Sequence, residues 1–413
     1  MPYIIGLNSG SSFDGLDAVL CTIDIGPDGH PTPPKFIDAL TVDWPDELQQ
    51  QILRAFENNL SLFEMARLNY AAGALYAEVT NSLLAKAGLK AEDIDVVGYD
   101  GQTIYQEPPD RKKMKDCLDG SFNPSIVSRW TNGGFPCGMF IAESGVVAAL
   151  TNITTVTQFR PVDHALGGSG APLMQYLDFV AFRNEEGPTV TLNIGGIANF
   201  QLADKDRSKM MAFDTGPGNV MIDHVMRARL GRGYDKDGEV AASGTAIHSL
   251  LEKLNSDARG FFERSPPRSA WRLDFGSFYA DSILQDKAYA SARTEDIVAT
   301  FTMFTATSVE RALVDFILPR APSLRKVIAS GGGTRNTTLM SFLCERLAIH
   351  GIGLCTSDEV GLPAAYKEAI KFATLGFATR NCLANNIPAA SGAEGFAVLG
   401  KMTFAPRLAS GLP

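Results

Sequence analysis

Short apolar runs alternate with longer helical patterns along most of the chain. Residues 3–7 (YIIGL) and 17–25 (DAVLCTIDI) predict two strands, and residues 94–101 (IDVVGYDG) predict a buried strand that runs into a glycine turn. Apolar residues at spacings of three and four predict helices over 46–58 and 61–88. Strands that alternate with helices favour an α/β architecture.

The second half of the chain continues this alternation. Residues 189–202 and 209–218 predict a strand pair, and 219–231 predicts the helix that follows. A strand over 325–333 ends in three glycines, and the last helix is predicted over 363–385. No repeat with a period of 20–50 residues is present in the sequence.

The domain boundaries are expected near residues 145–155 and near the final helix. This division gives a first domain of 1–150 plus 386–413 and a second domain of 151–385. A length of 413 residues with 45% hydrophobic content is enough for a large core and for two or three domains.

Charge and cysteine usage narrow the class of protein. The net charge is −9 and no long basic stripe occurs, so nucleic acid is not an expected partner. None of the six cysteines forms a CxxC pair or a Cys/His zinc spacing, so we expect free thiols in a reducing compartment. No uninterrupted run of about 18 apolar residues and no signal-peptide pattern is visible, so we expect a cytoplasmic protein without a membrane span.

Four strand-to-loop junctions are rich in glycine: LNSGSSFDG, LNIGGIANF, FDTGPGN and IASGGGTRN. Glycine lets the backbone approach a ligand closely, and exposed N–H groups can then face anionic oxygens. None of the four matches GxGxxG or GxxxxGK[ST], so neither the Rossmann nor the P-loop motif is present. Clustered phosphates need a divalent metal, and Asp14 is a candidate to position it, whereas Asp17 is expected to begin a strand.

Asp214 follows an apolar strand and precedes TGPG, which opens a helix. A carboxylate at a strand tip could take a proton from a nucleophile. It could equally serve as a helix cap or turn acid, and the spacing alone does not choose between these roles.

Together these segments resemble the anhydro-N-acetylmuramic acid kinases and their fungal relatives, the levoglucosan kinases. The resemblance runs from Ile5 to about Lys401 through IGLNSGSSFDGLDAVL, DGQTIYQEP, FRPVDHALGGSGAPL, LNIGGIANF, FDTGPGNVMID, YDKDGEVAASG, SGGGTRN and LPAAYKEAIKFA. YDKDG and KEAIKFA are more similar to the levoglucosan kinases.

The resemblance implies an actin-like ATPase fold of the sugar kinase type, with two ribonuclease H-like domains around a nucleotide cleft. It also implies an ATP- and Mg²⁺-dependent phosphotransferase. Water opens the internal bridge of a 1,6-anhydro sugar, and the freed 6-oxygen takes the γ-phosphoryl group. Levoglucosan is the first choice of substrate and 1,6-anhydro-N-acetylmuramic acid the second. Family members often pair as dimers, so a homodimer is one option for this chain.

The resemblance also assigns residues, and every assignment rests on it. Asp214 matches the general base, and the loop from Ser9 to Asp14 matches the phosphate-binding hairpin. The sugar site is matched by Arg160, Glu368, Gln102 and Thr103. The ATP site is matched by Ser9, Gly10, Ser11, Ser12, Asp14, Gly195, Gly196, Gly216, Gly331, Gly332, Gly333 and Asn336.

The chain departs from the family pattern at four positions. Asp100 stands in place of a histidine, Gln158 in place of an acid, Ser169 in place of a glutamine and Ser11 in place of a threonine. The first two changes alter charge on the expected sugar side. They leave two interpretations open: altered sugar specificity, or a catalytically impaired homologue that binds nucleotide or sugar. A third interpretation is that the chain is a kinase of an ordinary free sugar.

Two histidines invite a catalytic interpretation that the sequence does not support. His164 is next to Asp163, but no G-x-S-x-G elbow accompanies them, so a serine hydrolase triad is not indicated. We expect His164 and His224 to be packed structural residues.

Overall fold

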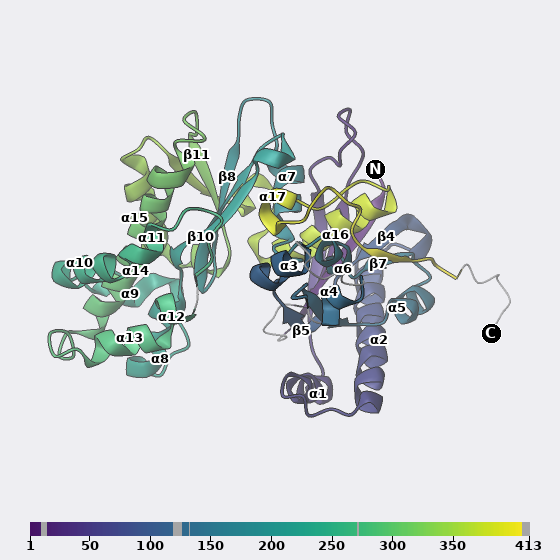
Figure 1. Ribbon diagram of the computed structural model, residues 1–413, viewed down its shortest axis with the longest axis horizontal. Helices are drawn as coiled ribbons and strands as arrows, with labels where there is room; N and C mark the ends of the chain where they lie inside the picture. Colours follow the sequence, from purple (N-terminus) through teal and green to yellow (C-terminus); the bar gives the residue numbers. More distant parts are fainter. Residues whose placement is uncertain (10–14, 119–125, 132, 271, 407–413) are drawn as a thin grey trace. The chain divides into compact units, whose positions relative to one another are not determined.

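The computed structural model describes residues 1–9, 15–118, 126–131, 133–270 and 272–406. Its contacts divide the chain into two compact units (Figure 1). The first unit contains residues 1–181 and 366–413, and the second contains residues 182–365. The predicted boundaries at 150 and 385 differ from these, because both fall inside the first unit.

The first unit is built on a six-stranded sheet with the order β13-β7-β4-β1-β2-β3. Strands β1, β2 and β3 are antiparallel neighbours, whereas β4 runs parallel to β1 and β7 parallel to β4. This is the strand order of a ribonuclease H-like domain, with β13 added antiparallel at the edge. The bounds are β1 Tyr3–Ser9, β2 Gly15–Thr22, β3 Lys35–Asp43, β4 Ile94–Gly98, β7 Thr155–Thr157 and β13 Lys401–Thr403.

Helix α2 (Leu62–Ala87) packs on one face of this sheet, among the core residues that include Ile5 and Leu7. Its ends follow from the sequence. Ser61 and Glu64 form a capping box at the start, and Gly88 ends the helix in the left-handed conformation. The predicted helix over 61–88 is therefore confirmed.

Helix α16 (Lys367–Arg380) lies against the opposite face of the sheet. Side chains alternate between the two faces of a strand, and a Cβ on Gly6 would face α16, whereas its neighbours Ile5 and Leu7 face α2. Gly6 and Gly98 are paired across β1 and β4. A Cβ at either glycine would overlap a backbone carbonyl of α16, that of Ala369 or Phe372 respectively. This close approach ties α16 to the first sheet and explains why the helix belongs to the first unit.

The second unit repeats the same strand order in a five-stranded sheet, β10-β9-β8-β11-β12. Its first three strands are antiparallel, and β11 and β12 continue parallel to β8. Helices α14 and α15 supply residues to its hydrophobic core. The bounds are β8 Thr189–Ile194, β9 Ile197–Ala203, β10 Met211–Pro217, β11 Lys326–Ser330, β12 Gly353–Thr356, α14 Thr294–Ala312 and α15 Thr337–Ala348.

The α/β fold class is confirmed by these two mixed sheets, whose matching order is that of the actin-like ATPase fold. Two details of the prediction are wrong. Residues 189–202 form the hairpin β8–β9 and not one strand, because Gly195 and Gly196 make a tight turn. The final helix ends at Arg380 and not near 385, because Cys382 adopts a left-handed φ of 56°.

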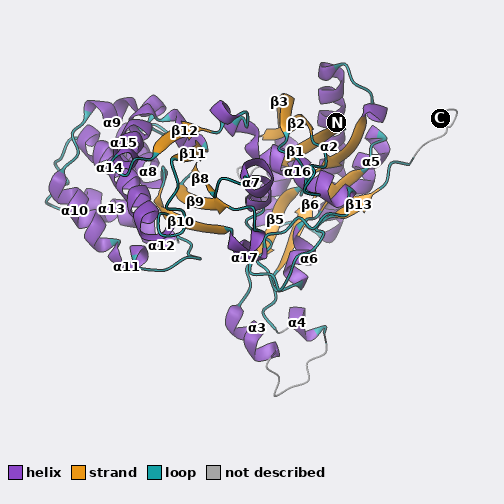
Figure 2. Cartoon of the chain, turned by 90° about the horizontal axis from the view of Figure 1, so that it is seen from above, coloured by secondary structure: helices purple, strands orange, loops and turns teal. Residues whose placement is uncertain are grey.

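The remaining elements complete the two units, with β5 and β6 forming a separate two-stranded sheet, and Figure 2 shows α3 and α4 lying apart from the large sheets. In the first unit they are α1 Asp46–Phe56, η1 Ala91–Asp93, β5 Gln102–Glu107, α3 Arg111–Leu118, α4 Ser128–Thr131, β6 Cys137–Ile141, α5 Ser144–Thr151, α6 Arg160–Ala165, α7 Met174–Phe182 and α17 Pro388–Ser391. In the second they are η2 Arg207–Lys209, α8 Val220–Leu230, η3 Lys236–Gly238, α9 Glu239–Ser243, α10 His248–Asp257, α11 Arg259–Phe262, α12 Arg272–Phe275, α13 Ser277–Gln285, η4 Leu313–Ile317, η5 Gly332–Arg335 and η6 Asp358–Val360. The short helix η7 (Ala364–Tyr366) stands where the chain passes back to the first unit.

Helix α14 and its π-helical continuation η4 form one segment, Thr294–Ile317, that is long and apolar enough to cross a membrane. However, 78% of the 18-residue apolar window in this segment is buried inside the protein. Such burial is typical of a core helix.

Candidate active site

Asp214 lies on β10 at the point where the strand loses its regular register, between Asp214 and Gly216. The residue is held from three sides. Its N–H donates to the Arg268 carbonyl at 3.0 Å, its carbonyl accepts from Arg268 Nε at 2.9 Å, and its carboxylate Oδ2 accepts from the Ala270 N–H at 2.7 Å. Within the described residues no other group donates to this carboxylate.

The surroundings of Asp214 suit a proton acceptor. Partial burial raises the pKa of its carboxyl group, while the Ala270 N–H and the charge of Arg268 lower it less strongly. The net pKa is above the ordinary value of an aspartate, which makes the ionised group a better base than an exposed one.

Arg268 is bonded to Asp214 but was not singled out as a site residue from the sequence. It is buried, and its Nη1 donates to the carbonyls of Phe262 at 2.8 Å and Arg264 at 3.0 Å. Burial lowers the pKa of its guanidinium to about 10. Arg268 therefore fixes the loop that holds Asp214, and no motif around it signals this function.

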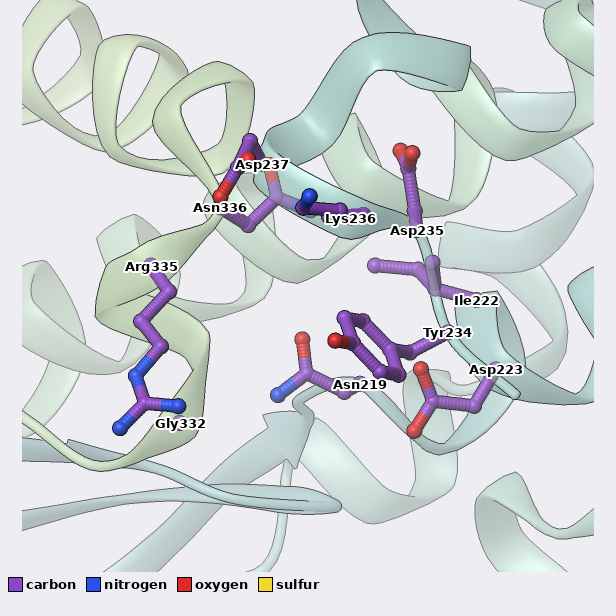
Figure 3. Close-up of a pocket in the computed structure, with 10 residues that line it drawn as sticks. All are labelled: Asn219, Ile222, Asp223, Tyr234, Asp235, Lys236, Asp237, Gly332, Arg335 and Asn336. Carbon is purple, nitrogen blue, oxygen red and sulfur yellow. The ribbon is translucent and has the colours of Figure 1, made fainter. Parts of the chain in front are cut away.

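A cavity of 460 Å³ opens in the second unit near the start of α8 (Figure 3). Figure 3 shows Arg335 on one side of it and Tyr234 with Asp223 on the other. Two of the predicted ATP-site residues, Gly332 and Asn336, are among those that line it. The full lining is Asn219, Ile222, Asp223, Tyr234, Asp235, Lys236, Asp237, Gly332, Arg335 and Asn336.

Local bonds hold two walls of this cavity together. The Asn336 side chain caps α15 by accepting from the Leu339 N–H at 2.9 Å. The next two residues, Thr337 and Thr338, donate their hydroxyls at 2.7 Å to the carbonyls of Asp237 and Gly238. The segment 234–238 is thereby fastened to the first turn of α15.

The three consecutive glycines differ in their packing. Gly331 has a φ of +89°, and a Cβ there would lie 2.7 Å from the Ile194 carbonyl. Gly333 has no room for a side chain because it packs on Ile194. Gly332, by contrast, has no atom within 4 Å of the place a Cβ would take, and it faces the cavity.

Gly195, Gly196 and Gly216 are bonded to or packed on the second unit itself, although Gly196 is exposed. The Gly195 carbonyl accepts the Asn219 N–H at 2.9 Å, and the Gly196 carbonyl accepts the Gly218 N–H at 2.8 Å. The N–H groups of Gly218 and Asn219, at the start of α8, are therefore already bonded within the protein, whereas the sequence suggested that such groups could face an anion. Gly216 packs on Ser308 of α14.

Two acids line the cavity in different ways. Asp235 is buried and caps α9 by accepting from the N–H groups of Val240 and Ala241, at 2.9 and 3.0 Å. Burial raises the pKa of Asp223 to about 6, with the charge of Arg227 opposing and that of Asp235 adding to the shift.

In the first unit, Asp100 and Arg160 form a buried ion pair. Asp100 Oδ2 lies 2.6 Å from Arg160 Nε, and Asp100 Oδ1 accepts from the Phe159 N–H at 3.0 Å. Arg160 also donates from Nη1 to the Gly170 carbonyl at 2.8 Å, and its guanidinium lies over the Phe140 ring. The departure at position 100 and the predicted sugar arginine are thus direct partners.

Glu368 stands at the start of α16 in a second group of charges. Lys371 pairs with Glu368, and Lys367 lies 3.1 Å from the fully buried carboxylate of Asp178. Partial burial raises the pKa of Glu368, but the charges of Lys371, Lys367 and Arg160 outweigh it, so the net pKa is lowered. Neither lysine nor Asp178 was singled out from the sequence.

Ser9 and Gln102 are also brought together. Ser9 Oγ donates to Gln102 Oε1 at 2.5 Å and accepts from Trp44 Nε1 at 2.9 Å. Thr103 is partly buried on β5, beside Gln102. Four predicted residues of the opening loop, Gly10, Ser11, Ser12 and Asp14, lie outside the described residues.

The described residues contain no group of three or more His, Cys, Asp and Glu side chains that could hold a metal. Asp17 belongs to β2 and accepts from Thr41 Oγ1 at 2.7 Å, as expected for a strand residue. His164 is buried in helix α6, and His224 Nε2 lies 2.6 Å from Asp281 Oδ1.

Comparisons with known proteins agree with the sequence motifs. The family model "Anhydro-N-acetylmuramic acid kinase" matches residues 2–118 and 122–405. The anhydro-N-acetylmuramic acid kinase of Caldanaerobacter subterraneus subsp. tengcongensis is 35% identical over 97% of this chain and 96% of its own length. That of Francisella tularensis subsp. novicida is 34% identical over 97% and 98%.

Among solved structures, component A of the Acidaminococcus fermentans (R)-2-hydroxyglutaryl-CoA dehydratase is similar over 92% of this chain and 100% of its own. Its TM-score is 0.43 and its identity 13%, so nothing about activity follows from it. The family match and the full-length relatives decide the assignment. The chain belongs to the anhydro-N-acetylmuramic acid kinase family and is an ATP-binding anhydro-sugar kinase, a phosphotransferase.

Proposed function

We propose that this kinase hydrolyses the internal bridge of a 1,6-anhydro sugar and phosphorylates the freed 6-oxygen, with Asp214 as the general base. Levoglucosan is the first candidate substrate and 1,6-anhydro-N-acetylmuramic acid, named for the relatives, the second. The observation that carries the proposal is the Asp214 carboxylate, with one oxygen fixed by Ala270 and a raised pKa.

The proposed reaction consumes one water molecule. Asp214 takes a proton from the water as its oxygen bonds to the anomeric carbon. The bond from that carbon to the bridging 6-oxygen breaks, and the 6-oxygen bonds to the γ-phosphorus while ADP leaves. The products are a sugar 6-phosphate and ADP, and Asp214 returns its proton to solvent.

The proposed nucleoside site is the cavity beside Gly332 and Asn336. Its volume of 460 Å³ lies in the range of pockets that take small-molecule ligands. Tyr234 and Arg335 offer flat groups for a base, and the acids offer acceptors for ribose hydroxyls.

Mg²⁺ would complete the site by neutralising phosphate charge. With a nucleotide it needs only one or two protein carboxylates beside phosphates and waters, so a three-ligand cluster is not required. Asp14 is the proposed protein ligand. Arg160, Glu368, Gln102 and Thr103 are the proposed sugar residues of the first unit.

The test is ADP release with ATP, Mg²⁺ and each sugar, for the wild type and for Asp214→Asn. We expect turnover by the wild type, loss of turnover in the variant, and equal ATP binding in both. With ¹⁸O-labelled water, the label should enter the anomeric hydroxyl in a single turnover, after correction for mutarotation. A rate in the variant equal to that of the wild type would exclude Asp214 as the base.

A further inference from the structure

The charged side chains around Arg160 and Glu368 are arranged in pairs. Arg160 is paired with Asp100, Lys371 with Glu368, and Lys367 with Asp178. Each cation of this charged cluster has its own carboxylate, so the three pairs sum to zero charge. A further carboxylate, Asp163, accepts from the Gly170 N–H at 2.8 Å, while the carbonyl of Gly170 accepts from Arg160.

The pair between Asp100 and Arg160 is held by several bonds. The Asp100 side chain is 2% exposed and the Arg160 side chain 14%. Both oxygens of Asp100 are used, one by Arg160 Nε and the other by the Phe159 N–H. The arginine cannot turn to another anion without leaving this carboxylate buried and unpaired, which is strongly unfavourable.

We infer that Asp100 makes this site selective for an uncharged anhydro sugar over one that carries a carboxylate. The inference rests on the proposed function and narrows its substrate class. Arg160 keeps N–H groups beyond those bonded to Asp100 and Gly170, and these can donate to sugar hydroxyls. The three cations of this cluster are already paired, so a substrate carboxylate would have to compete for them with Asp100, Glu368 and Asp178, and the charge of Asp163 would repel it.

Asp100 is a selectivity-determining residue here because it acts through Arg160. In Asp100→Asn the side chain keeps its shape and can still accept from the Phe159 N–H. The positive charge of Arg160 is then no longer compensated by a carboxylate. The variant should therefore gain affinity for a carboxylate-bearing sugar. A purely structural role of Asp100 would affect charged and uncharged sugars alike.

The experiment compares 1,6-anhydro-N-acetylmuramic acid with its carboxamide, which has nearly the same size but no charge. We expect the wild type to favour the carboxamide by at least about tenfold in kcat/KM, and Asp100→Asn to shift that ratio toward the acid by about tenfold or more. A wild type that prefers the acid, or a ratio unchanged in the variant, would overturn the inference.

Two further measurements keep the outcomes distinct. Calorimetric binding of the same two ligands gives the ratio even without turnover, so a failure of the proposed reaction is separated from a failure of the selectivity. If Asp100→Asn does not fold, as its thermal unfolding would reveal, the wild-type ratio alone decides. Asp17→Asn, a change of an equally charged residue on β2, serves as the control and should leave the ratio unchanged.

Discussion

The two units share one strand order, but the loops that follow their fourth strands, β4 and β11, differ in the groups that they present. In the first unit β4 leads into Tyr99, Asp100 and Gly101, and Gly101 has a φ of +94°. In the second unit β11 leads into Gly331, with a φ of +89°, and then into the open Gly332. The turn is similar, but one loop carries a buried carboxylate that holds Arg160 and the other presents bare backbone to a cavity.

The connections between the first two strands of the units differ in length. Residues 195 and 196 make a two-residue turn between β8 and β9, and their carbonyls are bonded to the entrance of α8. In the first unit, residues 10–14 connect β1 to β2. A duplicated topology thus fixes where loops emerge, while the residues in each loop decide what it can bind.

The largest expected effect follows from a change at Asp214 in the second unit. Asp214→Asn removes the proposed base but keeps a group that can accept from Ala270, so kcat should fall by about 10³-fold with little change in ATP affinity. Because the pKa of Asp214 is raised, the wild-type rate should rise with pH through a value above that of an ordinary aspartate. A pH–rate profile and nucleotide titration measure both effects.

The next prediction separates packing from binding within the glycine loop. Gly331→Ala forces an L-residue into a left-handed conformation against Ile194, so it should lower the free energy of unfolding by roughly 1–3 kcal/mol. Gly332→Ala meets open space and should change it by less than about 0.5 kcal/mol, yet weaken ATP binding by about tenfold. Denaturant unfolding and ATP titration of both variants distinguish these roles. Normal ATP binding by Gly332→Ala would contradict the proposed nucleoside site.

A pH-dependent effect should follow from Asp223 in the second unit. Its pKa of about 6 exceeds the ordinary value, so the native state binds this proton more tightly than the unfolded state. That stabilisation is complete below about pH 4 and is lost as the pH rises through 6. Asp223→Asn should therefore match the wild type in acid but exceed it by about 2 kcal/mol at pH 8. Urea unfolding at both pH values tests this, and an equal difference at each would contradict it.

The smallest expected effect concerns Asp17 in the first unit. Its carboxylate accepts from the exposed Thr41 hydroxyl, which is a bond of modest strength. Asp17→Asn should change the free energy of unfolding by less than about 1 kcal/mol and leave the KM for Mg·ATP unaltered. A marked rise in the Mg²⁺ requirement would instead assign Asp17 to the metal.

The sequence predicted the elements with strong periodicity. Helix α2 combines a long apolar pattern with a capping box and a terminal glycine, all of which are local signals. The hairpin β8–β9 was missed although its turn, Gly195 and Gly196, is itself a local signal, and the end of α16 was missed because apolar residues recur after Arg380, at Cys382 and Leu383. The candidate site followed from motifs, but Arg268 stands in none of them, and Lys371, although it lies inside KEAIKFA, was not singled out.

The sequence by itself determined the fold class and the family and singled out Asp214 as the candidate base, because periodicity, capping and motifs are properties of neighbouring residues. Only the tertiary structure decided that Asp100 pairs with Arg160, that Arg268 holds Asp214 and that α16 belongs to the first unit. These contacts join residues that are far apart in the chain, for example 60 positions between Asp100 and Arg160. Burial then sets how strongly such charges act, and burial is a property of the folded chain.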